Sequence, residues 1–220
     1  MSLLERFDKI KSTIPADVAL VAVSKTYSIE VIQEAYNLGQ RVFGENRVQE
    51  LTSKFEVLPK DIDWHLIGHL QKNKVKYIAP FVKLIHAVDS LELLQTIEKE
   101  GKKLNRKIPC LIQIHIAKED TKFGLSPEDV ETFFELEEIR MLEFAEIHGL
   151  MGMATFTDNL PQVEEEFETL AQLFNSIKSK SLSYLPHFNQ LSMGMSGDYT
   201  IAIEKGSTMV RVGSALFGAR

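Results

Sequence analysis

The sequence has very little cysteine and no long hydrophobic run. Its single thiol, Cys110, excludes an internal disulfide and is typical of a reducing compartment. The longest aliphatic runs, such as residues 18–23, are far too short to cross a bilayer. The first ten residues mix acidic and basic groups, where a secretory signal would carry an uninterrupted apolar stretch. We therefore expect a cytoplasmic protein that does not associate with membranes.

The sequence also lacks a net positive charge, because 31 Asp and Glu outnumber 25 Lys and Arg and the formal net charge is −6. No global field attracts nucleic acid, although residues 72–76 and 102–107 form two local basic clusters. Aromatic residues do not interleave these clusters, as a single-strand binding surface would require. We interpret them as solvated helix faces and predict no nucleic-acid partner.

A linker is absent as well, since no Pro/Gly/Ser-rich or low-complexity tract divides the 220 residues. This length suits one sizeable domain better than two. We expect a single domain over residues 1–220, and we expect it to be a monomer because nothing in the sequence demands an interface.

What the sequence does contain is a regular alternation of short apolar runs and amphipathic stretches, typical of a parallel sheet covered by helices. Strands are predicted at residues 18–23, 41–43, 64–67, 84–88, 109–116, 144–148, 188–192 and 209–212. Eight such units predict an α/β fold, a compact (β/α)8 TIM barrel. An open doubly wound sheet is the competing architecture; it usually has fewer strands, and no G-x-G-x-x-G follows the first strand.

Barrels of this kind carry their chemistry where the strands end, and Lys25 directly follows the apolar first strand. A lysine there is partly removed from water, which favours the neutral amine that attacks carbonyl groups. The alternative is that the side chain simply reaches solvent at the barrel rim.

A phosphate site is predicted at the ends of strands seven and eight. Residues 191–198 are rich in Gly and Ser and precede a short amphipathic stretch at 199–205, which Ser196 is expected to cap. Residues 211–214 end the eighth strand alongside, and barrels commonly bind phosphate at this place. A turn without a ligand remains the alternative.

An amine at strand one and a phosphate site at strands seven and eight suggest a phosphorylated aldehyde between them. Pyridoxal 5′-phosphate (PLP) fits this description, and so does a sugar phosphate in a Schiff-base aldolase. Arg211 favours PLP in a carrier or a racemase, because an arginine facing the pyridine nitrogen cannot accept its proton and leaves the ring a weak electron sink. Pairing of Arg211 with Asp198 or Glu204 stays open.

At these residues the sequence strongly resembles the pyridoxal phosphate homeostasis proteins, which are related to the N-terminal barrel domain of alanine racemases. The matching segments occur in order along essentially the whole chain: 21–26, 43–46, 48–50, 64–71, 73–74, 122–125, 148–153, 191–196, 206–213 and 217–218.

The resemblance implies the roles of eight residues toward PLP. It implies that Lys25 carries PLP as a Schiff base, that Asn46 lies near the phenolic oxygen of the ring, and that Arg211 faces the pyridine nitrogen. It also implies a set of phosphate contacts, with Met195 contributing its backbone: Ser192, Met195, Ser196, Gly213 and Ser214.

The family is implied to store, buffer and deliver PLP without robust catalysis. If delivery is direct, PLP-dependent apo-enzymes are the partners. A single-domain amino-acid racemase is the alternative; alanine racemases use a tyrosine from a second domain as the opposite base, for which we expect no room after the eighth unit. Tyr27 and Tyr199 flank the expected mouth but are interpreted as rim aromatics. No metal site is predicted, because Gly68 separates His65 from His69.

Overall fold

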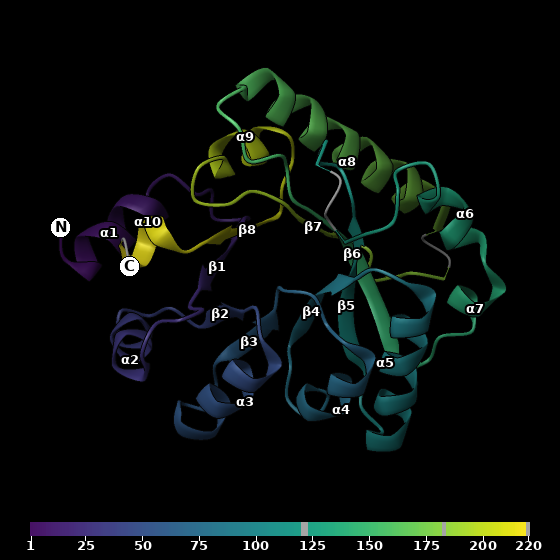
Figure 1. Cartoon of the computed structure of the whole chain (residues 1–220), viewed down its shortest axis with the longest axis horizontal. Helices are drawn as coiled ribbons and strands as arrows, with labels where there is room; N and C mark the ends of the chain where they lie inside the picture. Colours follow the sequence, from purple (N-terminus) through teal and green to yellow (C-terminus); the bar gives the residue numbers. More distant parts are fainter. Residues whose placement is uncertain (120–122, 182–183, 219–220) are drawn as a thin grey trace.

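Eight parallel strands close into a barrel in the order in which they occur along the chain, and β8 pairs with β1 (Figure 1). The computed structural model describes residues 1–119, 123–181 and 184–218; Lys122 and Arg220 therefore lie outside the described residues. The strands are β1 (Ala19–Val23), β2 (Val42–Glu45), β3 (Asp63–Leu66), β4 (Leu84–Val88), β5 (Ile108–Ile114), β6 (Ala145–Gly152), β7 (Gln190–Ser192) and β8 (Met209–Val212). The prediction of a (β/α)8 barrel is confirmed.

Helices surround this barrel and bury their apolar faces against the outside of the strands (Figure 1). They are α1 (Leu3–Lys11), α2 (Ile29–Asn37), α3 (Val48–Val57), α4 (Val75–Ile78) after the 3-10 turn η1 (Lys72–Lys74), α5 (Leu91–Leu104), α6 (Val130–Glu135), α7 (Glu137–Arg140), α8 (Leu160–Ser181), α9 (Tyr199–Glu204) and α10 (Ser214–Phe217). Among the largest fully buried side chains are Phe43, Trp64, Phe167 and Phe188. A second, smaller apolar cluster, which includes Val21, Leu84, Leu111, Met151 and Met209, fills the barrel interior.

Strand β6 is longer than predicted, and this changes where the next loop begins. The expected strand ended at His148, but β6 continues through Gly149 to Gly152. Gly149 has φ 153°, and a Cβ there would lie 1.7 Å from the carbonyl oxygen of Gln190. A glycine thus permits a close approach of β6 to β7, and the sequence signal that suggested a strand end marks this contact instead. Residues from 153 onward form the loop at the end of the strand.

The two ends of the described chain lie together beside β1 and β8, where α1 packs on α10 (Figure 1). Arg6 donates through Nε to the carbonyl oxygen of Leu216 at 2.7 Å and through Nη2 to that of Phe217 at 3.1 Å. The rings of Phe7 and Phe217 meet edge to face. Helix α10 was not predicted, because the sequence analysis assigned no element after the eighth strand. It fixes the segment that follows β8.

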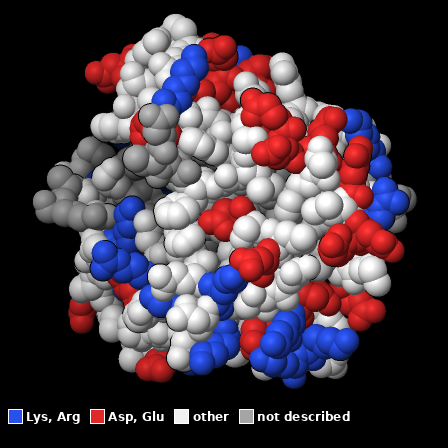
Figure 2. Space-filling model, turned by 45° about the vertical axis from the view of Figure 1, so that its right-hand side comes forward, with Lys and Arg blue, Asp and Glu red and all other residues white. Residues whose placement is uncertain are grey.

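None of the helices in the described ranges combines the length and the apolar character that a membrane crossing requires. On the face shown in Figure 2, acidic side chains gather in the upper and right-hand parts and basic side chains in the lower part.

Candidate cofactor site

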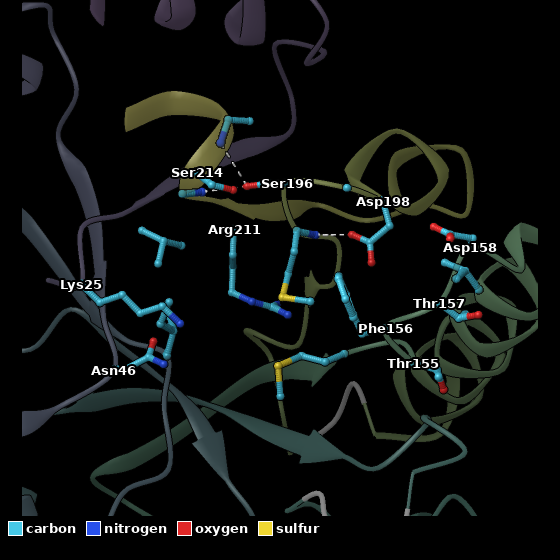
Figure 3. A pocket seen from close by; sticks show the side chains of 18 of the residues that line it. Lys25, Asn46, Thr155, Phe156, Thr157, Asp158, Ser196, Asp198, Arg211 and Ser214 are labelled. Atoms are coloured by element: carbon cyan, nitrogen blue, oxygen red, sulfur yellow. Dashed lines mark hydrogen bonds between the residues drawn. The ribbon is translucent and has the colours of Figure 1, made fainter. Parts of the chain in front are cut away.

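A cavity of about 1210 Å³ opens at the carboxyl ends of the strands, and loops after six of them line it. Lys25 and Asn46 enter from one side, after β1 and β2, and Arg211 reaches in from β8 (Figure 3). Ser196 and Ser214 lie along the upper edge in this view, and the loop after β6 lies across the cavity from Lys25 and Asn46. The barrel therefore gathers segments that are far apart in the sequence.

Seven of the eight predicted site residues line this cavity: Lys25, Asn46, Met195, Ser196, Arg211, Gly213 and Ser214. The eighth, Ser192, is fully buried and is not part of the lining. Its hydroxyl is hydrogen-bonded to Arg211 and His86. The structure places Ser192 where it supports the guanidinium of Arg211.

Arg211 is only 4% exposed, and its guanidinium is held mainly by oxygen atoms of the backbone. Nη1 donates to the carbonyl oxygen and to Oγ of Ser192, at 2.9 and 2.6 Å, and Nη2 donates to the carbonyl oxygen of Gly152 at 2.9 Å. Burial lowers the pKa of Arg211 to about 10, against the opposing field of Asp198. The group stays cationic at neutral pH, and it forms no ion pair with the described carboxylates, so the expected alternative of pairing with Asp198 or Glu204 is not seen.

The hydrogen bonds from Arg211 continue through Ser192 to two buried histidines. Nδ1 of His86 lies 3.1 Å from Oγ of Ser192, and Nε2 of His86 lies 3.0 Å from Nδ1 of His65. Because Ser192 accepts from Arg211, we assign its proton to the bond with His86, which then donates from Nε2 to His65. Both imidazoles are neutral in this arrangement. His69 faces another way and pairs with Asp89, so the two histidines weighed as metal ligands do not converge.

Ser196 does not cap α9, contrary to the prediction. Its Oγ accepts hydrogen bonds from the backbone N–H groups of Gly213, at 3.1 Å, and Ala215, at 3.4 Å (Figure 3). The residue before α9 is Asp198, which makes no side-chain cap and instead accepts from the N–H of Met195. The physical reason is that the loop after β7 crosses the first turn of α10, which offers its own unpaired N–H groups.

This crossing leaves a set of donors suited to an anion. The backbone N–H groups of Ser196, Gly197 and Ser214 have no hydrogen-bond acceptor among the described residues. A Cβ at Gly213 would lie 3.2 Å from Cβ of Val23, so a glycine there lets the loop pass close to β1. Unpaired N–H groups beside two serine hydroxyls fit a phosphate.

The sequence analysis missed the opposite wall, residues 155–158, because it ended β6 too early. Thr155 is anchored by Glu166, whose Oε2 accepts from its N–H at 2.6 Å and whose Oε1 accepts from its hydroxyl at 2.7 Å. Phe156 is 95% exposed and yet lines the cavity. The polar run after an apolar strand was the only available signal.

The hydroxyls of the two tyrosines that flank the mouth are both hydrogen-bonded to other parts of the chain. Tyr27 donates to the carbonyl oxygen of Gly218 at 2.7 Å, and the hydroxyl of Tyr199 lies 2.8 Å from that of Thr13. Neither tyrosine lines the cavity. The interpretation of both as rim aromatics agrees with these contacts.

Comparison with known proteins gives the same family from two directions. The family model described as alanine racemase, N-terminal domain, matches residues 2–220. The pyridoxal phosphate homeostasis protein of Aquifex aeolicus is 43% identical over 204 residues, which are 91% of this chain and 86% of that protein.

Solved structures agree. PipY of Synechococcus elongatus without PLP is 35% identical, with a TM-score of 0.90 over 99% of this chain and 100% of that chain. PipY with PLP bound is 34% identical, with a TM-score of 0.87 over the same shares. An alanine racemase of Clostridium difficile is 18% identical and shares the fold, with a TM-score of 0.76 over 99% of this chain and 56% of that one. The chain belongs to the pyridoxal phosphate homeostasis protein family, whose barrel is that of the alanine racemase N-terminal domain.

Proposed function

We propose that this chain binds PLP in the cavity and acts in PLP homeostasis as a carrier that stores and delivers the cofactor. The observation that carries the proposal is the convergence of an amine, a buried guanidinium and an anion cradle in one cavity. The relatives named for PLP homeostasis, and PipY with PLP bound, support it.

The residues present fit PLP. Lys25 would hold the cofactor covalently through its amine, with Asn46 beside the ring. Arg211 would direct Nε at the pyridine nitrogen, since Nε has no acceptor among the described residues. Ser196, Gly197 and Ser214 would bind the phosphate. When bound, PLP supplies an aldehyde that reacts reversibly with amines and a ring that withdraws electrons.

The carrier reading is favoured over a racemase by what the cavity offers as a base. Racemisation needs a second acid–base group on the face opposite the lysine. Both nearby tyrosines hydrogen-bond to other groups. Two carboxylates line the cavity: Asp198 accepts from the N–H of Met195, and Asp158 is the candidate base that the racemisation assay below tests. Arg211 does not distinguish the two, because a ring whose proton it cannot accept suits a carrier and a racemase alike.

The proposal is tested by loading the purified protein with PLP and reducing it with borohydride. We expect one mass adduct, on a peptide that contains Lys25, and we expect none after Lys25→Ala. An adduct that persists in Lys25→Ala would refute the assignment of Lys25.

Two further assays distinguish a PLP carrier from a PLP-dependent catalyst. The PLP-loaded protein should reactivate a PLP-dependent apo-enzyme. The extent of reactivation is compared with that given by the same concentration of free PLP. It should not convert L-alanine or L-serine to the D-isomer faster than free PLP does. Sustained racemisation above that background would overturn the carrier reading.

A further inference from the structure

A buried cluster of charged side chains holds the backbone on the strand side of Lys25, and it lies outside the cavity lining. Nζ of Lys54, on α3, donates to the carbonyl oxygen of Ser24 at 2.8 Å. The hydroxyl of Ser24 donates to Oε1 of Glu45, at the end of β2, at 2.6 Å. Lys54 and Glu45 form an ion pair at 2.8 Å. The side chains of Lys54 and Glu45 therefore both hydrogen-bond to Ser24, the residue that precedes Lys25.

The residue that follows Lys25 is held by the same cluster. Thr26 has φ 67°, in the left-handed region that a β-branched residue rarely adopts. Its backbone N–H donates to Oε1 of Glu50 at 2.6 Å, and the same oxygen accepts from Nζ of Lys54 at 2.7 Å. An unfavourable backbone conformation therefore follows Lys25 directly, and the cluster supplies an acceptor that stabilises it.

Burial and charge indicate that this cluster serves geometry more than stability. Glu45 is fully buried and Lys54 is 5% exposed, and Oε2 of Glu45 has no hydrogen-bond partner among the described residues. Burial raises the pKa of Glu45 in spite of Lys54. For Glu50, burial acts in the same direction, but the hydrogen bonds from Lys54 and Thr26 outweigh it and lower its pKa. Buried ion pairs add little net stability over apolar packing, so the effect to look for here is on the local geometry of the backbone that they contact.

We infer that Glu45, Glu50 and Lys54 form a positioning network for Lys25, which fixes the backbone on both sides of it so that its amine meets an aldehyde in the cavity. This inference rests on the proposed function. The network acts on capture of the aldehyde and leaves the phosphate contacts and Arg211 unchanged, because those come from β8 and from the loops after β7 and β8. The test changes Glu50 and Lys54 and leaves Glu45 in place, because Glu45 directly precedes Asn46.

The test compares two ligands on the full chain. PLP has the aldehyde, and 4′-deoxypyridoxine 5′-phosphate has the same ring and phosphate with a methyl group in its place. Glu50→Ala removes the acceptor of the Thr26 N–H and should lower the preference for PLP over the deoxy ligand about tenfold, which matches the cost of one non-glycine residue in the left-handed region. Affinity for the deoxy ligand should not change.

Two further variants sharpen the result. Glu50→Gln keeps an oxygen acceptor for Thr26 and should retain most of the preference. Lys54→Met should lower it as Glu50→Ala does. Glu98→Ala is the matched control: its carboxylate accepts from the backbone N–H groups of three residues at the start of β6, so its loss should reduce stability without changing the preference.

The outcomes separate the two proposals. If folded Glu50→Ala keeps the wild-type preference, or if both ligands weaken equally, the positioning network is refuted while covalent capture by the wild type stands. If the wild type itself shows no preference and no borohydride adduct on Lys25, the proposed function fails, and the inference fails with it.

Discussion

The neutral histidine pair beneath the cavity predicts a loss of stability in mild acid. Burial lowers the pKa of His65 to about 3, with a smaller effect of Lys83. Burial also holds the pKa of His86 well below its ordinary value, with smaller effects of His65 and Arg211. In the unfolded chain both histidines have the ordinary pKa of a free imidazole, near 6.5. Below that pH the unfolded state binds protons that the folded state does not, so stability is complete above it and is lost as the pH falls toward the folded pKa values.

The magnitude follows from the proton difference. Each unmatched proton lowers the free energy of unfolding by about 1.4 kcal/mol per pH unit. Between pH 7 and pH 5, His65 alone accounts for about 2 kcal/mol and the pair for about 4 kcal/mol. Glu45 opposes this trend, since its raised pKa lets the folded state take up a proton first, whereas the lowered pKa of His148 adds to it. Glu45 and His148 are present in both proteins, so their contributions cancel when the wild type is compared with a variant that lacks one buried histidine.

The assay is urea unfolding at half-unit pH intervals from 7 to 5, for the wild type and for His65→Asn. Asparagine places an oxygen near the position of Nδ1, so the bond from His86 is kept while one titrating group is removed. The pH slope of the variant should be shallower by about one proton, or about 1.4 kcal/mol per pH unit. Asn175→Gln changes a neutral, exposed side chain on α8, so it is the control and should leave the slope unchanged. Equal slopes in the wild type and His65→Asn would contradict the neutral pair.

Three other changes have outcomes that the structure fixes. Gly149→Ala puts a Cβ 1.7 Å from the carbonyl oxygen of Gln190 at a positive φ, so the variant should lose at least about 3 kcal/mol or fail to yield folded protein, as purification and urea unfolding will show. Ser192→Ala leaves Arg211 without a side-chain acceptor and should cost about 1–3 kcal/mol and weaken PLP binding, measured by titration of PLP absorbance. Cys110 is buried, which raises the pKa of its thiol, so it should react with a thiol reagent far more slowly in buffer than in urea; equal rates would refute its burial.

The barrel itself was predictable from the sequence because its signals are local. Each strand is a short apolar run, and β4 and β8 have the predicted limits. Side chains at strand ends must meet at the mouth of a closed barrel, so the positions of Lys25 and Arg211 follow from the strand count. Strand ends were less predictable where a glycine serves a close contact, as at Gly149.

The partners of the site residues could not be predicted, since they depend on contacts between distant elements. Ser196 is followed by a plausible helix start, yet its hydroxyl bonds α10, which is adjacent only in space. Lys54 reads as one charged residue on an amphipathic helix, and nothing in its neighbours shows that it is buried against Ser24 and Glu45. The burial and the hydrogen-bond partners of such a side chain are known only from the folded barrel.

The geometry of the cavity agrees with the proposed role of Lys25 as the point of attachment in a carrier. Arg211 is fixed by backbone carbonyl oxygens and Ser192, so it is a permanent cation that would take no proton from a bound ring. The outer wall of the cavity includes Phe156, whose side chain is almost fully exposed, so that wall does not seal the site from water and amines. Catalysis by PLP gains from a proton on the ring and from exclusion of water, whereas exchange of the cofactor with another amine gains from access. If the network positions Lys25 as we infer, a fixed lysine in an accessible cavity would favour capture and release over catalysis.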